Sequence, residues 1–363
     1  MSDERYMKRA VAEAKKALGR THPNPAVGAV IVKAGQVIAT GFHARAGTPH
    51  AEAVALAKAG PRAKGATLYS TLEPCNHQGR TPPCTEAIIS AGIARVVYAS
   101  ADPNPLVNGK GHRRLVAAGV AVVPEVLRED ADALNQPFFK SVTTGLPWVT
   151  LKAGVTLDGK LATEARRSKW ITSEASRARA QALRNQVDAI VVGAGTVSAD
   201  DPQLTTRFPG GRNPVRVVLD SRLGSAPRAR VFDTSEARTI VATLVSGQHA
   251  RARALAKKGV ELWTLPARHG QVALRPLLEK LCKAGLLHVL VEGGAEVHAA
   301  FIGQRLADEL MLFVAPKLFG HPGLTWVGEL GRLTPATAPT LTGLRAEAIG
   351  DDLLLHARFA SGR

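Results

Sequence analysis

The 363-residue sequence has little cysteine, with three residues in all. A sparse, odd number of cysteines does not form a disulfide framework, which excludes the small disulfide-stabilised secreted domains. No apolar run approaches the length of a transmembrane helix, and residues 1–8 are charged rather than an apolar signal segment. These absences predict a cytoplasmic protein that has no membrane partner.

Aromatic residues are also scarce, at 4% of the chain, and 47 Lys and Arg outnumber 30 Asp and Glu. The resulting net charge of +17 invites a nucleic-acid interpretation. However, unpaired bases are usually held by stacked aromatic side chains, and the arginines here are spread along the chain. We therefore expect the charge to attract small phosphorylated substrates and a dinucleotide cofactor, not nucleic acid. A tRNA-binding or nucleic-acid-editing deaminase is the principal alternative.

The length predicts two domains of ordinary size. Short apolar strands alternate with helical segments in both halves, which is typical of α/β domains, the first with three layers. A helical stretch at 125–140 and a connector at 141–147 place the boundary, giving domains at 1–145 and 146–363. Strands are expected at 27–32 and 37–41 (a hairpin), 66–72, 95–99, 120–123, 148–153, 188–193, 215–220, 239–242, 288–292 and 310–314, and further helices at 173–184 and 273–284.

Four residues of the first half are hard to explain by packing: His50, Glu52, Cys75 and Cys84. Positions i and i+2 do not face each other within a regular helix, so His50 and Glu52 are expected where a helix begins. Cys84 follows two prolines, which favour the start of a second helix. Cys75 comes just after a buried strand. The two helix starts and the strand end are expected to meet at one point.

One histidine and two cysteines match a catalytic zinc site, which leaves the fourth position to water. Zinc brings the pKa of that water near neutrality, and Glu52 is then the natural proton carrier. The set predicts hydrolytic deamination of an aminated heterocycle. The alternative is a closed, purely structural zinc site in a non-enzymatic scaffold, with His77 as the fourth ligand, which would leave Glu52 without a task.

Two strand exits of the second half carry glycines, at Gly193 and Gly195 and at Gly293 and Gly294. Amide groups at the start of a helix behind such a strand can bind phosphate. A glycine pair alone is more often a turn, and neither segment matches G-x-G-x-x-G, so an ordinary Rossmann domain is not supported. Two such exits nevertheless favour a nucleotide site.

The zinc motif resembles the zinc-dependent nucleobase and nucleoside deaminases, although eight residues rather than two separate Cys75 from Cys84. That longer loop and the segments 22–30 and 102–105 resemble one branch, the deaminase half of bifunctional riboflavin-biosynthesis deaminase/reductases. The resemblance implies a cytidine-deaminase-like fold, with Zn2+ on His50, Cys75 and Cys84 and proton transfer by Glu52. It also makes Asn24 a substrate contact, a position otherwise typical of a turn.

The second half resembles the reductase domain of the same family over 152–160, 168–172, 195–202 and 292–294. This implies a dihydrofolate-reductase-like α/β fold and NADPH as cofactor. The implied reaction sequence is deamination of 2,5-diamino-6-(5-phosphoribosylamino)pyrimidin-4(3H)-one, followed by reduction of the ribosyl group to ribityl. Implied cofactor contacts are Gly154, Trp170, Thr196, Asp200, Ser221, Gly294, Ala295, Glu296, Val297, His298, Ala299 and Ala300. Implied substrate contacts are Ser168, Arg184, Leu204, Arg207 and Glu292.

Some positions have a plainer interpretation when the resemblance is set aside. Arg184 and Arg207 are then typical of surface charges, and Trp170 of a core residue. Members of the family often carry Gly-Glu before Ser-x-Trp, where this chain has Arg166 and Arg167. The residues alone do not choose the heterocycle, NADPH over NADH, or whether the chain forms a homo-oligomer.

Overall fold

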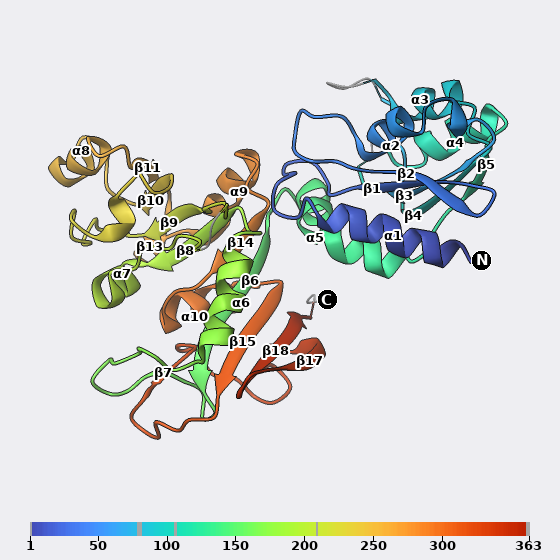
Figure 1. Ribbon diagram of the computed structural model, residues 1–363. Coiled ribbons are helices and arrows are strands. Elements are labelled where there is room, and N and C mark those ends of the chain that lie inside the picture. The colour runs from blue at the N-terminus through green and yellow to red at the C-terminus, as the bar shows by residue number, and fades with distance from the viewer. Residues whose placement is uncertain (1, 78–81, 105–106, 208–209, 361–363) are drawn as a thin grey trace. The chain divides into compact units, whose positions relative to one another are not determined.

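The computed structural model describes residues 2–77, 82–104, 107–207 and 210–360. The chain divides into two compact units, Met1–Leu146 and Pro147–Arg363, each built around a sheet of its own (Figure 1). No helix within these described ranges is long and apolar enough to cross a bilayer.

The first unit contains a five-stranded sheet in the order β2-β1-β3-β4-β5. Its strands are β1 (Gly28–Lys33), β2 (Gln36–Phe42), β3 (Thr67–Leu72), β4 (Arg95–Ser100) and β5 (Ala121–Val123). β1 runs antiparallel to β2 and β3, whereas β3, β4 and β5 are parallel. The predicted hairpin and the later strands are confirmed. The parallel strands end at a common edge, and Cys75 follows β3 there.

Helices cover both faces of this sheet, as Figure 1 shows. Residues from α1 (Asp3–Lys15) and α5 (Arg128–Thr144) form one apolar core with one side of the strands. Residues from α2 (Ala51–Ala59), α3 (Cys84–Ser90) and α4 (Lys110–Ala117) form another core with the opposite side. Val30 and Ile31 show the alternation, because these neighbours of β1 enter different cores. The predicted three-layer domain is therefore confirmed.

The end of α5 differs from the prediction. A connector was expected from 141 onward, but the helix continues to Thr144. Ser141, Thr143 and Thr144 donate their hydroxyls to main-chain carbonyls three or four residues earlier, at 2.7–2.8 Å. These bonds satisfy the polar side chains inside the helix, so polarity alone was a misleading sign of a loop. Gly145, at φ 71°, ends the helix in the left-handed conformation.

The second unit contains a nine-stranded sheet in the order β11-β10-β9-β8-β14-β6-β15-β18-β17. The strands from β11 to β15 in this order are parallel, and β18 and β17 are antiparallel to their neighbours. The strands are β6 (Trp148–Thr156), β8 (Ala189–Gly193), β9 (Val215–Leu219), β10 (Thr239–Thr243), β11 (Glu261–Thr264), β14 (His288–Val291), β15 (Glu309–Ala315), β17 (Leu341–Ile349) and β18 (Asp352–Phe359).

Five α-helices belong to the described part of this unit: α6 (Glu174–Arg184), α7 (Ala194–Asp200), α8 (Ala250–Ala256), α9 (Leu274–Lys283) and α10 (Ala295–Gly303). The expected helices at α6 and α9 are confirmed, and the Ser173 hydroxyl caps α6 by accepting from the Ser176 amide. Strand prediction stopped at Val314, so β17 and β18 were missed. β17 is exposed along almost its whole length and has no continuous apolar run to reveal it.

The remaining short elements connect the larger ones. They are the 3-10 helices η1 (Gly60–Ala63) and η2 (Arg230–Phe232), and the strand pairs β7 (Lys160–Ala162) with β16 (Leu324–Thr325) and β12 (Ala267–Arg268) with β13 (Gln271–Val272).

Candidate active sites

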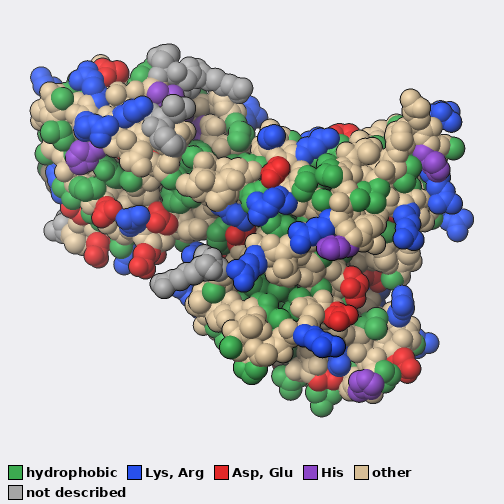
Figure 2. Space-filling view, turned by 180° about the vertical axis from the view of Figure 1, so that it is seen from behind, with side chains coloured by type: hydrophobic (Ala, Val, Ile, Leu, Met, Phe, Trp, Pro, Cys, Tyr) green, Lys and Arg blue, Asp and Glu red, His purple; other side chains and the backbone are tan. Residues whose placement is uncertain are grey.

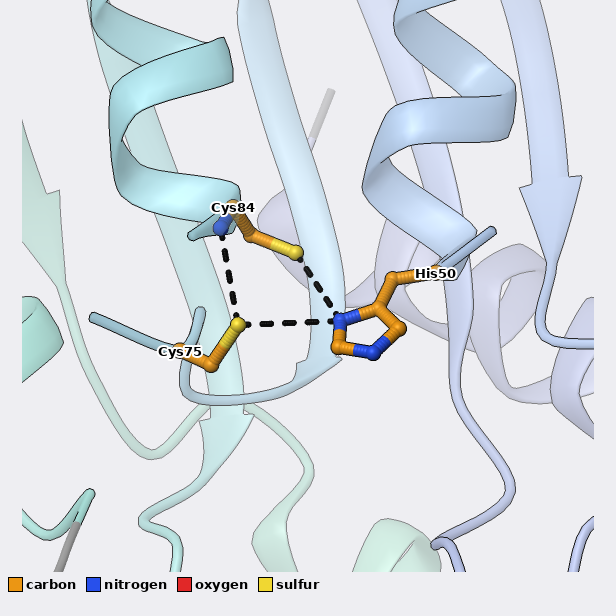
Figure 3. A group of neighbouring side chains, drawn as sticks. All are labelled: His50, Cys75 and Cys84. Atoms are coloured by element: carbon orange, nitrogen blue, oxygen red, sulfur yellow. Dashed lines mark hydrogen bonds between the residues drawn. The ribbon is translucent and has the colours of Figure 1, made fainter. Parts of the chain in front are cut away.

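Three side chains of the first unit converge as the sequence predicted. His50 caps the N-terminus of α2, Cys84 begins α3, and Cys75 lies in the loop after β3 (Figure 3). The Nδ1 atom of His50 lies 3.2 Å from the sulfur of Cys84 and 3.6 Å from that of Cys75. All three ligand atoms fall within 4.8 Å of one another. One imidazole nitrogen and two sulfurs at this spacing fit the donor set of a zinc ion.

The charges of this group also suit a cation. The thiol and the amide of Cys84 donate to Cys75, and His50 adds a further hydrogen bond, so the pKa of Cys75 falls to about 4. The hydrogen bond that its thiol donates to Cys75, and then burial, raise the pKa of Cys84 well above its usual value. The shifts thus favour the thiolate of Cys75 and the thiol of Cys84. A bound cation would supply the positive charge that the second thiolate requires.

Glu52 lies in the first turn of α2, two residues after His50, and is only 4% exposed. The Ser70 hydroxyl donates to Glu52 Oε1 at 3.4 Å. Burial first, and then the negative charge of Cys75, raise the pKa of the Glu52 carboxyl. A carboxyl whose pKa is raised can both take up and release a proton near neutral pH.

His77, the candidate fourth ligand, does not join the group. Among the described residues the metal-binding group consists of His50, Cys75 and Cys84, and His77 is exposed to solvent. The closed structural site is therefore not supported. Residues 78–81 and 105, which belong to the segments that carry the family resemblance, lie outside the described residues.

A buried carboxylate that the sequence did not single out supports the Cys75 loop. Glu73 accepts hydrogen bonds from the main-chain amides of Gly109 and His112, at 3.0 and 3.1 Å, and so joins the loop to the start of α4. Gly111 lies so close that a Cβ there would be 1.9 Å from the Pro74 carbonyl oxygen. Only its position between a strand and Pro-Cys could have marked Glu73 in advance.

His43 supports the other side of the group. It is 2% exposed, and its ring meets that of His50 edge-on at 5.5 Å. Its Nδ1 lies 3.2 Å from the Pro49 carbonyl oxygen, which can only accept, so Nδ1 carries the proton. Its Nε2 then accepts from the Asn24 side-chain amide at 3.1 Å. Asn24, which the resemblance implies to contact substrate, is thus held by a histidine that packs on His50.

In the second unit the two glycine-bearing strand exits lie side by side, because β8 and β14 are neighbours in the sheet. A Cβ on Gly293 would lie 2.8 Å from Val192 Cα, and one on Gly193 would lie 2.9 Å from Val297. A Cβ on Gly294 would lie 3.4 Å from Thr196 Oγ1. Such close approach accounts for the glycines and brings two implied cofactor contacts together, which fits a phosphate-binding edge.

The remaining implied cofactor contacts are distributed around this edge. Asp200 ends α7 and accepts from the hydroxyl of Ser168, an implied substrate contact, at 3.2 Å. Ser221 donates its hydroxyl to the Gln271 side chain and accepts from the Val272 amide, so its hydroxyl is held by the β12–β13 region. His298 is 1% exposed, with Nδ1 2.9 Å from the Trp326 carbonyl oxygen, so its side chain supports the fold.

Three charged side chains meet beside the glycine exits. Arg184 forms a two-point ion pair with Glu292 at 2.9 and 2.7 Å, and their side chains are only 12% and 8% exposed. This burial contradicts the interpretation of Arg184 as a surface charge. Burial by itself would raise the pKa of Glu292, but the charges of Arg184 and Lys152 outweigh it and lower that pKa to about 2. Glu292 is therefore a stable carboxylate.

Lys152 is the functional candidate that sequence reasoning did not select. Its Nζ lies 3.9 Å from Glu292 and 5.7 Å from the ring centroid of Phe313. Burial first, and then the charge of Arg184, lower the pKa of Lys152 although Glu292 opposes them. A buried ammonium with a lowered pKa is a better proton donor than an ordinary lysine. Its place in an apolar strand concealed it.

The other implied substrate contacts surround Arg184. Its Nη1 donates to the Thr205 carbonyl, and the neighbouring Leu204 is buried at φ 58°. Arg207 is exposed, and its main-chain amide donates at 3.1 Å to the side chain of Gln181, which lies on α6 with Arg184. Burial, followed by the charges of Arg184 and Arg230, lowers its pKa. The geometry thus gathers Arg184, Leu204, Arg207 and Glu292 in one region.

Comparisons with known proteins agree with this division. Residues 1–100 match the family described as the cytidine and deoxycytidylate deaminase zinc-binding region, and residues 147–355 match the RibD C-terminal domain. The riboflavin biosynthesis protein RibD of Aquifex aeolicus is 46% identical over 354 residues, 97% of each chain. The chain belongs to the RibD family. The RibD of Escherichia coli is 40% identical and covers 98% of this chain and 99% of its own.

Solved RibD structures extend the agreement to three dimensions. RibD of Acinetobacter baumannii matches with a TM-score of 0.89 at 38% identity and 99% coverage of both chains. A Thermotoga maritima protein described as a diaminohydroxyphosphoribosylaminopyrimidine deaminase/5-amino-6-(5-phosphoribosylamino)uracil reductase matches at 0.88, with 39% identity and 98% coverage. The predicted family and its two-part α/β fold are confirmed.

Proposed function

We propose that this RibD chain catalyses two successive steps of riboflavin biosynthesis, with one active site in each unit. Unit Met1–Leu146 deaminates 2,5-diamino-6-(5-phosphoribosylamino)pyrimidin-4(3H)-one, and unit Pro147–Arg363 reduces the ribosyl group of the resulting 5-amino-6-(5-phosphoribosylamino)uracil. The observation that best supports this proposal is the group of His50, Cys75 and Cys84 with the buried Glu52 beside it.

In the deaminase step, zinc on these three ligands would lower the pKa of a water molecule. Glu52 takes the proton of this water and delivers it to the ring nitrogen, while the water oxygen bonds to the amine-bearing carbon. Glu52 would then take the remaining proton of that oxygen and give it to the amino group, so that a carbonyl forms as the C–N bond breaks and ammonia leaves. Asn24, whose side-chain amide is held by its hydrogen bond to His43, would contact the substrate.

In the reductase step, NADPH would supply a hydride to the sugar C1 carbon in its ring-opened imine form. The imine nitrogen must gain a proton at the same time, and Lys152 is the buried donor beside Glu292. Glu292 is suited to bind sugar hydroxyls, and Arg207 to bind the phosphate, because Arg184 is engaged by Glu292. Gly154, Trp170, Thr196, Asp200, Ser221 and the first turn after Gly294 would contact the cofactor.

The assignment of one step to each unit is tested by Glu52→Gln. This variant should release no ammonia from the diaminopyrimidine substrate, yet oxidise NADPH at the wild-type rate when given the deaminated uracil compound. Ammonia and the absorbance of NADPH are followed together. Loss of both activities, in a variant that keeps its zinc, would contradict independent sites.

The basic composition favours one alternative hypothesis, in which the protein is a deaminase that binds tRNA. On the face shown in Figure 2, Lys and Arg side chains are dispersed, with Asp and Glu among them, and form no continuous tract. We therefore propose a small phosphorylated pyrimidine as the only kind of substrate, in the cytoplasm, where the thiols Cys75 and Cys84 stay reduced. Tight, steeply salt-dependent retention of tRNA on a filter would overturn this.

A further inference from the structure

Trp170 is 61% exposed, which makes it the tryptophan with the most solvent-accessible surface in the described part of the chain. This exposure contradicts its interpretation as a core residue. A large aromatic ring left in water costs free energy unless something covers it in the working protein. The segment that carries it is nevertheless held firmly, by side chains from two other parts of the unit.

Arg177, from α6, holds the indole itself. The centre of its guanidinium lies 4.6 Å from the centroid of the Trp170 ring, within the range of a cation–π contact. The same guanidinium donates to the Thr172 carbonyl at 2.7 Å, so its own position is fixed. One face of the indole is therefore covered by Arg177, and the side chain's exposure leaves the rest of the ring available.

Lys317, which follows β15, holds the backbone of the same segment. Its Nζ donates to the carbonyl oxygens of Trp170 and Ile171, at 2.9 and 2.7 Å. Lys317 is in turn anchored, because its carbonyl accepts from the Leu157 amide at 2.9 Å. Next to it, Asp158 accepts from the amides of Phe319 and Gly320. An ammonium bound to two carbonyls is a strong local restraint.

The position of this segment points to the reacting end of the cofactor. A Cβ on Gly154 would lie 3.2 Å from Thr172, so the Trp170 segment packs on β6 at Gly154. Gly154 and Lys152 are two residues apart on one strand and therefore share a face of the sheet. Lys152 reaches Glu292 on that face.

We propose that Lys317 and Arg177 are positioning residues that hold the indole of Trp170 as a stacking platform for the nicotinamide ring of the cofactor. The inference rests on the proposed function in taking Trp170 as a cofactor contact. Arg177 occupies one face of the indole, so the nicotinamide ring stacks on the other. Neither positioning residue touches the cofactor.

The test measures the Kd of NADPH for Trp170→Ala, Arg177→Gln and Lys317→Met, alone and combined. Stacking on an aromatic ring is worth about 1 kcal/mol, so Trp170→Ala should weaken NADPH about fivefold to tenfold. Arg177→Gln and Lys317→Met should each weaken it about threefold in the wild-type background. In the Trp170→Ala background both should have no further effect, because they act only through the indole.

A second probe, 2′-phospho-ADP-ribose, keeps the adenylate half of the cofactor and lacks nicotinamide. Its Kd should be unchanged in all these variants, and a parallel loss would place the adenine ring at the platform and overturn the proposal. Lys317→Arg should restore NADPH binding, whereas Arg177→Lys should restore only part, because it loses the planar stack. Arg179→Gln, an exposed position on α6, is the matched control.

The possible outcomes distinguish the cofactor contact of Trp170 from the positioning role of Arg177 and Lys317. If Trp170→Ala leaves NADPH binding intact, the cofactor contact within the proposed function fails. If Trp170→Ala weakens NADPH binding but Arg177→Gln and Lys317→Met do not, the positioning role fails and the cofactor contact stands. The same conclusion follows if Arg177→Gln and Lys317→Met weaken binding as much in the Trp170→Ala background as in the wild type. Urea unfolding followed by the emission of the second unit's other tryptophans verifies that each variant is folded.

Discussion

The two active sites of this chain are assembled over very different distances in sequence. In the first unit, His50 and Cys84 are 34 residues apart, and all four reactive groups lie at element ends. In the second unit, Arg184 and Glu292 are 108 residues apart, and Lys317 reaches back 147 residues to Trp170. A site whose residues are close in sequence can be predicted from a motif. A site whose residues are far apart in sequence can be recognised only when the strand register is known.

The sites also differ in how they balance charge. The first holds two sulfurs and a buried carboxyl, whose ionised forms require a cation that the chain does not supply. The second neutralises Glu292 internally with Arg184 and Lys152. The first unit should therefore depend on its metal, and the second on its ion pairs.

Removing a metal ligand should have the largest effect. Cys84→Ala should reduce bound zinc from about one equivalent to almost none and abolish ammonia release, because two ligands hold zinc poorly. NADPH oxidation on the deaminated substrate should stay within about twofold of wild type. Zinc is measured by atomic absorption. Cys282→Ala, which changes the third cysteine, is the control and should alter neither the bound zinc nor the two activities. Zinc retained in Cys84→Ala would refute the ligand assignment.

Breaking the buried ion pair should have the next largest effect, confined to the second unit. Arg184→Ala leaves the Glu292 carboxylate buried and should cost about 3–5 kcal/mol. Arg238→Ala breaks an exposed pair with Glu261, of similar geometry but with side chains 44% and 41% exposed, and should cost less than about 1 kcal/mol. Urea unfolding followed by tryptophan emission reports this unit, since all four tryptophans follow Leu146. Equal costs would contradict the burial argument.

Acid should change the stabilising contributions of one buried carboxyl in each unit in opposite directions. The pKa of Glu292 is about 2 in the folded chain against 4.5 unperturbed, so its stabilisation is complete above pH 4.5 and is lost as pH falls toward 2. That loss is on the order of 3 kcal/mol. Burial raises the pKa of Asp102 to about 6, so this carboxyl of the first unit instead contributes stability that grows as pH falls from 6 to 3.8.

The measurement is urea unfolding at a series of pH values between 7 and 3. Tryptophan emission follows the second unit, and zinc-free protein with tyrosine absorbance follows the first, because all three tyrosines precede Leu146. Asp102→Asn should remove the contribution of this carboxyl, so the stability of the first unit should change differently between pH 6 and 3.8 in the variant and the wild type. A second unit whose stability is flat from pH 4.5 to 3 would contradict the assigned ionisation of Glu292.

A smaller effect should follow from crowding the Cys75 loop. Gly111→Ala places a Cβ against the Pro74 carbonyl and should displace the loop, lowering zinc affinity about tenfold while the reductase is unaffected. Zinc release to a chromophoric chelator measures this. Gly303→Ala is the control, because nothing lies within 4 Å of a Cβ there. Unchanged zinc affinity in Gly111→Ala would mean that the loop is held independently of α4.

Sequence reasoning succeeded where local rules decide the structure. Helix signals and ligand spacing predicted the starts of α2 and α3, the β1–β2 hairpin and the convergence of His50, Cys75 and Cys84. It failed where tertiary contacts decide. The polar residues Ser141 to Thr144 form a helix, because their hydroxyls find carbonyls there. Lys152 gains significance only when β6 lies beside β14, and Lys317 and Arg177 belong to no motif.

The central claim is that each unit contains a complete active site. It is tested most directly by mixing two variants, Glu52→Gln, which lacks deamination, and Lys152→Met, which lacks reduction. With the diaminopyrimidine substrate and NADPH, Lys152→Met alone should only release ammonia, and Glu52→Gln alone should carry out neither reaction. The mixture should also oxidise NADPH and form the ribityl product. A mixture that stays inactive, although each variant retains its other activity, would contradict the claim.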